Sequence, residues 1–580
     1  MKLQKIAAIL TATLLLAGCG GSGDSASRPT VTTQNGQVVG VERNGANEYR
    51  GIPYATAERW ALPVPAAAWS APLDATNFGP ACPQTARFNL TEASADENCL
   101  SINVSTPTHV APGEKLPVFV WIHGGAFIGG ASNLYRLDKL AREGRMVVVS
   151  MNYRIGALGF MPNPAFQVTN SAGSFNGNFG LEDQRLAMRW VQQNIGAFGG
   201  DKNNVTVAGE SAGAGSVCTH LSAPTQVAGL FQKAVIQSFG CMTDLRTVTQ
   251  SQEPGLASVF MQNELCPAES TSAAVLACMR SKSVAQILAA QEKYTDSHPF
   301  DTMPFWPVTG SSTEANTTVP TSFKAALTNN TLVTVPMIYG GTQSELDLYV
   351  GYYWQANNYS VTTQPGIDAL LSIFYMGDES RINAIKTRYP GLSNFDNFTA
   401  AKTLGTAVSD YNPAAGINNC TYLQTSNAIK NNHGGRYAAN PIYQFEFADP
   451  DAPVCGVGIA EPCPPFVMTG PVHSSELNYF FPNLSNTAAI NAPNLKPKSQ
   501  ILADQMVAYW AQFAATGNPN KAGLADWPVY NGSTGSNNVL RFMPGAIATF
   551  DADAEHQCSS FWSNTAYDPP MYRLPNAPPF

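Results

Sequence analysis

The clearest structural signal in the chain is the stretch Val205-Thr-Val-Ala-Gly-Glu-Ser-Ala-Gly-Ala-Gly-Ser-Val-Cys-Thr-His-Leu221. Its first four residues are mostly β-branched and have the length of a buried strand, and its last eight have the composition of a helix. Between them, Gly209-Glu-Ser-Ala-Gly213 matches the pattern G-x-S-x-G. This motif requires a strand-turn-helix setting, because its serine must stand on a sharp, strained turn at the edge of a sheet. The stretch therefore predicts a nucleophilic serine at Ser211, and a passive serine in a glycine-lined turn is the alternative.

Other short apolar runs also have the length of buried strands. They are Val118–Ile122, Val147–Ser150, Ala234–Ile236, Val335–Tyr339 and Tyr443–Phe447. Helical periodicity separates some of them, most clearly over 181–198, and another helical pattern covers about 497–513. Strands without polar alternation, separated by helices, favour the α/β class with a largely parallel sheet covered on both faces. Residues from about 245 to 440 carry helix-like stretches and loops, which predicts a large insertion over one end of the sheet.

Composition limits the class of protein and its partners. The chain has 580 residues, of which 13% are charged and 44% hydrophobic, and its formal net charge is −8. An average soluble protein carries about 25% charged residues, so a coiled coil and a highly charged disordered chain are excluded. Nucleic acid is not expected as a partner, because the sequence has no basic stripe to replace phosphate counterions. No long polar linker divides residues 31–580, so we expect one domain there.

The first 18 residues have the pattern of an export signal. Two lysines precede the apolar run Ile6–Leu16, which is too short to span a bilayer. Leu16-Ala-Gly-Cys19 resembles a bacterial lipoprotein box, in which Cys19 is lipidated after cleavage at residue 18. Residues 19–30 then predict a flexible tether. We expect an exported protein that is lipid-anchored in the bacterial cell envelope, at the outer membrane or periplasmic face, with secretion behind an ordinary signal peptide as the alternative.

A glycine-rich turn follows the strand at 118–122. Its sequence is His123-Gly-Gly-Ala-Phe127, and its glycines let backbone N–H groups approach a substrate oxygen. A serine nucleophile needs such donors, because negative charge develops on the carbonyl oxygen that it attacks. It also needs a base to take its proton. The turn therefore predicts an oxyanion hole, with an ordinary strand exit as the alternative.

These motifs belong to an ordered series of landmarks. The others are Arg50–Ala55, Glu97–Val104, Asn152–Phe160, Gly177–Gln184, Phe513–Asn520 and Trp527–Tyr530. From about Gly40 to Phe561 the chain resembles the type-B carboxylesterase family of α/β-hydrolases, which includes cholinesterases and bacterial para-nitrobenzyl esterases. The resemblance implies a serine esterase that acts on small to medium carboxylic esters and needs no cofactor or metal. It also implies that the insertion at 245–440 shapes the substrate site.

The resemblance indicates the acid of a catalytic triad. In this family the acid follows a strand in the pattern G-x4-E, which Gly340-Gly-Thr-Gln-Ser-Glu345 matches. Leu346 stands where the family usually has glycine, and Asp347 is the nearest alternative acid. The resemblance therefore implies that Glu345 orients the catalytic base.

The catalytic histidine follows from a second family pattern, G-x-x-H with a glutamate three positions later. Gly470-Pro-Val-His-Ser-Ser-Glu476 matches it, with serine in place of the usual glycine after His473. The implied order of nucleophile, acid and base is that of the α/β-hydrolase fold. The complete implied site consists of the triad Ser211, Glu345 and His473 and the oxyanion donors Gly125, Ala126 and Ala212.

Several other polar residues are not expected to take part in catalysis. Glu210 resembles a buried acid and Ser238 a secondary serine of the family, and a structural polar contact is the expectation for both. Four histidines lack a motif, and we expect surface positions for them: His109, His298, His433 and His556.

Ten cysteines remain besides Cys19, and an exported protein can form disulfides. Three pairs close short loops and are the expected bridges: Cys82–Cys99, Cys266–Cys278 and Cys455–Cys463. The resemblance supports the first two pairs. Metal binding is the alternative for the cysteines, although the sequence has no C-x-x-C and its histidines are scattered.

Two other functions remain open at this point. One is a lipase or a hydrolase of aromatic esters or polyesters with the same fold, and the other is a non-catalytic binding module, as some members of the family are. The choice of ester depends on the pocket. Aromatic residues of the insertion can either line this pocket or belong to the core, and we expect most of them to belong to the core. These residues are Phe300, Phe305, Trp306, Tyr349, Tyr352, Tyr353 and Trp354.

Overall fold

The computed structural model describes most of the chain between Arg28 and Ser563. The described residues are 28–86, 91–298, 301, 303–351, 361–413, 416–433, 436, 439–453, 470–482, 484, 495–532, 536 and 538–563. The predicted signal, Cys19 and most of the predicted tether lie outside them.

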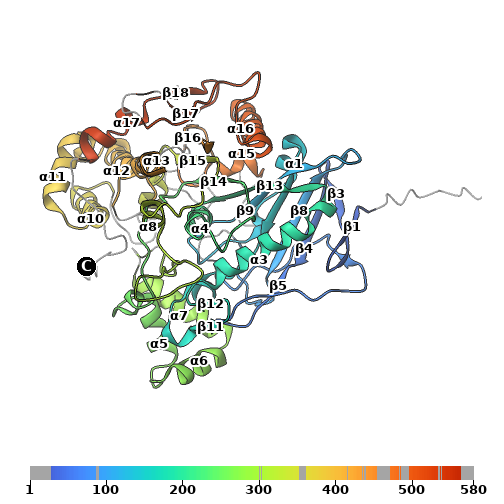
Figure 1. The fold of residues 1–580 in the computed structure, drawn as a ribbon. Coiled ribbons are helices and arrows are strands. Elements are labelled where there is room, and N and C mark those ends of the chain that lie inside the picture. Colours follow the sequence, from blue (N-terminus) through green and yellow to red (C-terminus); the bar gives the residue numbers. More distant parts are fainter. Residues whose placement is uncertain are drawn as a thin grey trace, which may run out of the picture.

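An eleven-stranded sheet runs through the molecule in the order β18-β17-β16-β15-β14-β13-β9-β10-β8-β4-β3 (Figure 1). Neighbouring strands are parallel from β10 to β17. The outer strands pair antiparallel. The bounds are β3 (Val41–Arg43), β4 (Ala46–Pro53), β8 (Ser101–Pro107), β9 (Leu116–Ile122), β10 (Val147–Met151), β13 (Gly200–Glu210), β14 (Lys233–Gln237), β15 (Met337–Thr342), β16 (Ile442–Phe447), β17 (Val539–Phe542) and β18 (Ala548–Phe550). The predicted α/β sheet is confirmed, and the strands at its two ends were not predicted.

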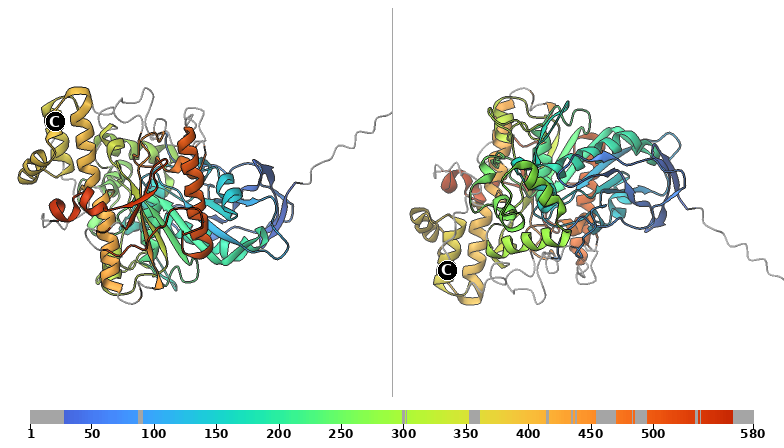
Figure 2. Two further views of the ribbon diagram at one scale, coloured as in Figure 1. Left: turned by 90° about the horizontal axis from the view of Figure 1, so that it is seen from above. Right: turned by 90° about the horizontal axis from the view of Figure 1, so that it is seen from below.

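Alternate side chains of the central strands enter two separate cores, because successive strand residues point to opposite faces. In β9, Val118 and Val120 enter one core, whereas Phe119 and Trp121 enter the other. The first core contains α3 (Phe179–Asn194) and α4 (Ala212–Leu221), and the second contains α1 (Asp138–Gly144), α15 (Leu477–Phe480) and α16 (Pro497–Thr516). The two views of Figure 2 show different helices in front of the sheet, with α16 in the view from above. Helices therefore cover both faces, as predicted.

The predicted insertion consists of two helical groups on either side of β15. The first group follows β14 and contains α5 (Ala257–Leu265), α6 (Ser272–Ser281), α7 (Val284–Ser297) and α8 (Phe323–Thr328). The second follows β15 and contains α10 (Gln364–Phe374), α11 (Glu379–Arg388), α12 (Thr399–Asp410) and α13 (Asn419–His433). Figure 1 shows α5, α6 and α7 below the sheet and α10, α11 and α12 beyond its β18 side. The range 245–440 therefore encloses β15, a strand of the central sheet.

The smaller elements surround this framework. They are β1 (Thr30–Thr33), β2 (Gly36–Val39), β5 (Ala55–Thr56), β6 (Val64–Pro65), β7 (Leu73–Asp74), β11 (Val168–Asn170), β12 (Gly173–Phe175), α2 (Gly156–Phe160) and α17 (Ala552–Glu555). Within the described part of the chain, no single helix is long and apolar enough to cross a bilayer. The bent pair α6 and α7 meets that criterion only by length and composition.

Four disulfides join described cysteines. Cys82–Cys99 and Cys266–Cys278 are present, as predicted. Cys218–Cys241 and Cys420–Cys558 were not predicted, and they link residues that are 23 and 138 positions apart. Cys455 and Cys463 lie outside the described residues, so the third predicted bridge stays a prediction.

His556 is buried between two carboxylates, so the expected surface position was wrong. Its Nδ1 lies 2.6 Å from Asp410 Oδ1 and its Nε2 lies 2.6 Å from Glu446 Oε2. Asp410 ends α12 and Glu446 belongs to β16, so the histidine joins the second helical group to the sheet. Burial opposes the charged imidazole, but the two carboxylates outweigh burial and raise the pKa of His556 to about 10. A charged imidazolium therefore holds the two elements together near neutral pH.

Replacing His556 by glutamine is expected to lower the free energy of unfolding at pH 6 by about 3–5 kcal/mol, because it leaves two buried carboxylates facing each other. The pKa of His556 is higher in the folded state than the ordinary value of 6.5. Its stabilisation is therefore complete below pH 6.5 and is lost as the pH rises to about 10. Urea unfolding at pH 6, 8 and 10 measures this loss.

The matched control is His109→Gln, which changes an exposed histidine. We expect this variant to differ from the wild type by less than about 0.5 kcal/mol at each pH. A difference between His556→Gln and wild type that is the same at pH 6 and pH 10 would contradict a charged His556.

Candidate active site

Ser211 occupies the turn between β13 and α4 with φ +55° and ψ −126°, a backbone conformation that is strained for a residue with a side chain. The neighbouring glycines make this turn sterically possible. A Cβ on Gly209 would lie 2.4 Å from the carbonyl carbon of Gly213, and a Cβ on Gly213 would lie 2.1 Å from the carbonyl oxygen of Ile122. The Ser211 N–H donates to the Gln237 carbonyl at 3.0 Å, which fixes the turn against β14. The strand-turn-helix setting predicted from the sequence is present.

The glycine-rich turn after β9 has three consecutive residues with positive φ: Gly125 at +112°, Ala126 at +54° and Phe127 at +58°. A Cβ on Gly125 would lie 2.2 Å from the carbonyl oxygen of Gly129, so this position requires glycine. Within the described turn, no hydrogen bond uses the N–H of Gly125 or of Ala126. Both donors are therefore available to a ligand.

His123 holds this turn in place. Its Nδ1 donates to the carbonyl oxygen of Gly124 at 2.8 Å, and its own carbonyl accepts from the Tyr153 hydroxyl at 2.7 Å. The imidazole also stacks on the Tyr153 ring, with 4.3 Å between the centroids. Burial lowers the pKa of His123 to about 4, so the ring is neutral. These contacts restrict the backbone that presents the two free N–H groups.

The glycine-rich turn packs directly against the Ser211 elbow. A Cβ on Gly124 would lie 3.1 Å from Ser211 Cβ and 2.9 Å from the Glu210 carboxylate. Ala212 is the first residue of α4, and the N–H groups in the first turn of a helix have no partner within the helix. The structure therefore places the predicted donors Gly125 and Ala126 beside the elbow that carries the third, Ala212.

Glu345 and His473 meet at the carboxyl end of β15. The loop with His473 pairs with the loop after β15, where the Ser344 N–H donates to the Pro471 carbonyl at 2.9 Å. Nδ1 of His473 lies 2.8 Å from Oε2 of Glu345. The other oxygen, Oε1, accepts the N–H of Thr342 and the hydroxyl of Tyr422, each at 2.9 Å. The structure thus brings together two of the three predicted triad residues, and three partners fix the carboxylate.

Asp347, the alternative acid, lies against α12. A Cβ on Gly405 of α12 would collide with the Asp347 carboxylate. Burial raises the pKa of Asp347 to about 8, which favours its neutral form. Among the described residues, the acids within 4.0 Å of the His473 ring nitrogens are Glu345 and Glu210, so Asp347 does not contact this histidine.

The other ring nitrogen of His473, Nε2, faces the residue before the nucleophile. It lies 3.3 Å from Oε1 of Glu210 and has no hydrogen bond to any described residue, Ser211 included. Glu210 Oε1 also accepts the Ser474 hydroxyl at 2.5 Å. Ser474 has φ +67°, a backbone conformation that glycine adopts more readily than serine. Glu210 therefore makes the polar contacts that we expected from the sequence, one with Ser474 and one with His473, the candidate catalytic base.

Three buried glutamates surround His473. Glu476 accepts the Gln237 side-chain amide at 3.0 Å, and burial together with Glu210 and Glu345 raises its pKa to about 8. Burial also raises the pKa of Glu210. Burial opposes the charged form of His473, but Glu210 and Glu345 outweigh it and raise its pKa to about 9. The surrounding carboxylates therefore stabilise the imidazolium form of His473.

An aromatic pocket adjoins α4 at Gly215, one helical turn from the nucleophile. Phe127, Gly215, Phe239 and Trp306 contribute to its wall. Of the aromatic residues singled out in the sequence, Phe305 is in the core, and Tyr349 lies against His473 with 5.8 Å between ring centroids. Phe300, Tyr352, Tyr353 and Trp354 lie outside the described residues. Across the ranges that the structure covers, no group of three or more His, Cys, Asp or Glu side chains is arranged to hold a metal ion.

Known proteins resemble this chain over nearly its whole length. A sequence model of the carboxylesterase family matches residues 27–561. The para-nitrobenzyl esterase of Bacillus subtilis (strain 168) is 30% identical over 522 residues, which cover 88% of this chain and 94% of that protein. Cocaine esterase of Homo sapiens is 29% identical over 564 residues, 92% of each. The solved structure of a thermophilic PNB esterase has a TM-score of 0.68 at 27% identity and covers 92% of this chain and 99% of that one. The chain therefore has the α/β-hydrolase fold and belongs to the carboxylesterase family.

Proposed function

We propose that this carboxylesterase hydrolyses small to medium carboxylic esters through the triad Ser211, His473 and Glu345 and an acyl-enzyme intermediate. The observation that carries the proposal is the 2.8 Å contact between His473 Nδ1 and Glu345 Oε2. This contact keeps a proton on Nδ1, so a neutral His473 has its lone pair on Nε2. Nε2 is the ring nitrogen that faces the elbow of Ser211.

In the first half of the reaction, Nε2 of neutral His473 takes the Ser211 proton while the hydroxyl oxygen attacks the ester carbonyl. Glu345 stabilises the resulting imidazolium and keeps its orientation. The imidazolium then gives its proton to the leaving alcohol. In the second half, a water molecule activated by His473 attacks the acyl group on Ser211 and releases the acid.

The oxyanion formed in both halves accepts hydrogen bonds from the N–H groups of Gly125, Ala126 and Ala212. Support for this role comes from the unused donors of the glycine-rich turn and from its packing against the elbow. Such donors act strongly because they are fixed before the reaction and are shielded from water. Loss of one donor typically costs about 2.7–4 kcal/mol of transition-state stabilisation.

A fluorophosphonate probe tests whether the site is catalytic. Such probes react with an activated serine, so we expect one covalent adduct per chain on Ser211, located by peptide mass spectrometry. Prior labelling should abolish hydrolysis of 4-nitrophenyl butyrate. A native protein that neither reacts with the probe nor turns over the ester would favour the non-catalytic binding module. Activity that rises steeply with acyl length beyond about ten carbons would favour a lipase.

We further propose that residues 1–18 are removed as a lipoprotein signal, that Cys19 carries the lipid, and that residues 19–30 tether a single domain, 31–580, to the cell envelope. Support comes from the four disulfides, because such bridges persist mainly in oxidising compartments. The variant Cys19→Ser should remain unprocessed and lose its membrane partitioning in a bacterial host. Unchanged maturation of this variant would contradict the lipid anchor.

A further inference from the structure

Ser474, the residue after the catalytic candidate His473, joins the histidine loop to the nucleophile elbow. Its hydroxyl donates to Glu210 Oε1 at 2.5 Å, and the same carboxylate oxygen lies 3.3 Å from Nε2 of His473. All three side chains are buried. One oxygen atom of Glu210 is therefore shared between a hydroxyl donor and the ring nitrogen that is proposed to receive the Ser211 proton.

The ionisation state of Glu210 decides whether Nε2 is available to Ser211. A protonated carboxyl donates its O–H to the lone pair of Nε2, and this hydrogen bond occupies the position of the catalytic base. An ionised carboxylate can only accept, so it leaves the lone pair of neutral His473 free. Burial raises the pKa of Glu210, whereas the charge of His473 and the hydroxyl of Ser474 lower it. Burial and the Ser474 hydroxyl therefore act in opposite directions on the same carboxyl group.

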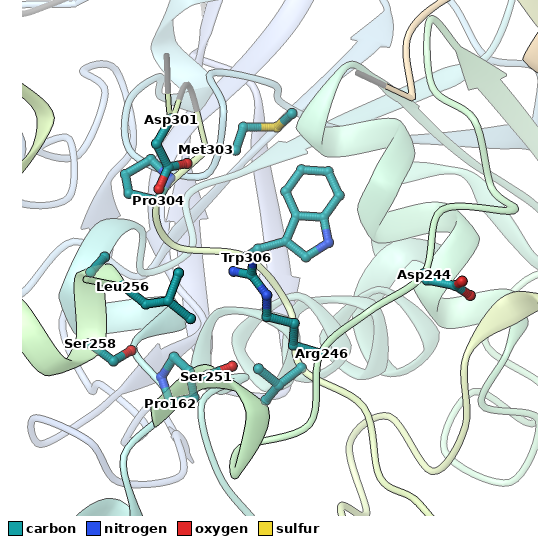
Figure 3. Close-up of a pocket in the computed structure, with 12 residues that line it drawn as sticks. Pro162, Asp244, Arg246, Ser251, Leu256, Ser258, Asp301, Met303, Pro304 and Trp306 are labelled. Atoms are coloured by element: carbon teal, nitrogen blue, oxygen red, sulfur yellow. The ribbon is translucent and has the colours of Figure 1, made fainter. Parts of the chain in front are cut away.

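Other titratable groups face His473 and Glu210 from the elements packed against them. They are Glu345, Glu476, Tyr135 and Tyr349. Against the effect of burial, the two glutamates raise the pKa of His473, and burial raises the pKa of Tyr135, which keeps its hydroxyl neutral. The titratable groups that line the pocket at Trp306 are not among those with the largest effect on His473 or Glu210: Asp244, Arg246 and Asp301 (Figure 3). The surrounding acids thus favour a proton on the pair of Glu210 and His473, and the Ser474 hydroxyl opposes it.

We propose that Ser474 is a positioning residue that keeps Glu210 ionised beside His473 and thereby leaves Nε2 free to accept the proton of Ser211. This inference rests on the proposed function. The hydroxyl acts through Glu210 and does not touch the reacting atoms. It stabilises the carboxylate most when His473 is neutral, because an imidazolium otherwise supplies the compensating charge. Without the hydroxyl, the pair of Glu210 and His473 keeps its shared proton up to a higher pH.

Two substitutions in the full-length protein separate the hydroxyl from the backbone conformation. Ser474→Gly removes the hydroxyl and relieves the positive φ, whereas Ser474→Ala removes the hydroxyl and keeps a Cβ. The matched control is Ser475→Ala, which removes the next hydroxyl of the same loop, a buried group that forms no hydrogen bond with any described residue. The readout is kcat/KM for ethyl butyrate, followed by base consumption in a pH-stat from pH 6 to 10. Its acid limb reports the proton that must leave the free enzyme before catalysis.

We expect both Ser474 variants to move the acid limb of kcat/KM to higher pH by about one unit, because a hydrogen bond to a charged group is lost. At a pH below the limb, their kcat/KM should therefore be about tenfold lower than that of the wild type. The difference should shrink as the pH rises, whereas general damage to the loop would lower kcat/KM equally at every pH. Ser475→Ala should keep the wild-type profile.

A double-mutant cycle tests whether the hydroxyl acts through Glu210. In a Glu210→Gln background, which has no carboxyl to titrate, Ser474→Gly should move the acid limb by less than about 0.2 unit. An equal shift in both backgrounds would overturn the inference. So would an acid limb that neither Ser474 variant moves, or a change of profile confined to Ser474→Ala. A wild-type protein that hydrolyses no ester would instead overturn the proposed function on which this inference rests.

Discussion

The variant Ser211→Ala should lose about a million-fold in kcat for 4-nitrophenyl butyrate. The remaining rate should be the slow direct attack of water on an ester that is still bound and held by the oxyanion donors. The expected loss is this large because the serine oxygen forms the covalent intermediate, and alanine leaves His473 without a group to deprotonate. Stopped-flow assays measure the wild-type rate, and assays over long incubation times measure the remaining rate of the variant. The fluorophosphonate probe should not label the variant. The elbow itself should survive, because its geometry depends on Gly209 and Gly213.

A matched control separates loss of the nucleophile from loss of a buried hydroxyl. Ser105→Ala removes a serine that is buried in β8 of the same sheet and whose hydroxyl has no described partner. Its activity should stay within about twofold of the wild type, because the Ser105 hydroxyl forms no hydrogen bond with any described residue. If Ser211→Ala, folded by circular dichroism, kept more than about 1% of the wild-type rate, Ser211 would not be the nucleophile.

The sequence was most informative where the determining contacts are local. The Ser211 elbow could be predicted because strand, turn and helix follow one another within 17 residues and the glycines are required by contacts within the motif or with one adjacent strand. His473 and Glu345 have no such local signature. They were found only through the family resemblance, and the structure adds what orients them: Tyr422, from a helix of the insertion, donates to Glu345.

The errors concern residues whose surroundings are distant in the sequence. His556 has no motif, and its two carboxylate partners lie 146 and 110 residues away, so no local pattern could show that it is buried. The bridge Cys420–Cys558 spans 138 residues for the same reason. A pairing rule based on short loops finds bridges such as Cys266–Cys278 and misses those that only the folded sheet brings together.

Ser474 illustrates how a departure from the family pattern can be informative. The serine replaces a usual glycine and adopts a positive φ, which costs free energy for a residue with a side chain. Its hydroxyl compensates by donating to Glu210, the acid that faces Nε2 of His473. The substitution therefore marks a contact between the histidine loop and the elbow, which the sequence alone could not show.

The variant Glu345→Gln is expected to lower kcat/KM by about ten-thousand-fold, close to the effect of the same change in other triads. The hydrogen bonds of Glu345 explain why the amide should be so harmful. Its Oε1 accepts from the backbone of Thr342 and from Tyr422, so the amide oxygen of glutamine must take that position. The amide nitrogen then faces Nδ1 of His473, which can only accept from it. The proton of neutral His473 is thereby forced onto Nε2, where it prevents deprotonation of Ser211.

The matched comparison is Asp347→Asn, which lies two positions further along the chain, at the start of the following helical segment. Asp347 lies against Gly405 and does not contact His473, so this variant should keep at least about a tenth of the wild-type kcat/KM. Glu345→Asp should lie between the two, because it keeps the charge but shortens the reach to Nδ1. Steady-state assays with 4-nitrophenyl butyrate on all three variants decide the matter. If Asp347→Asn lost more activity than Glu345→Gln, the acid of the triad would be Asp347, and the 2.8 Å contact of Glu345 with His473 would be a purely structural one.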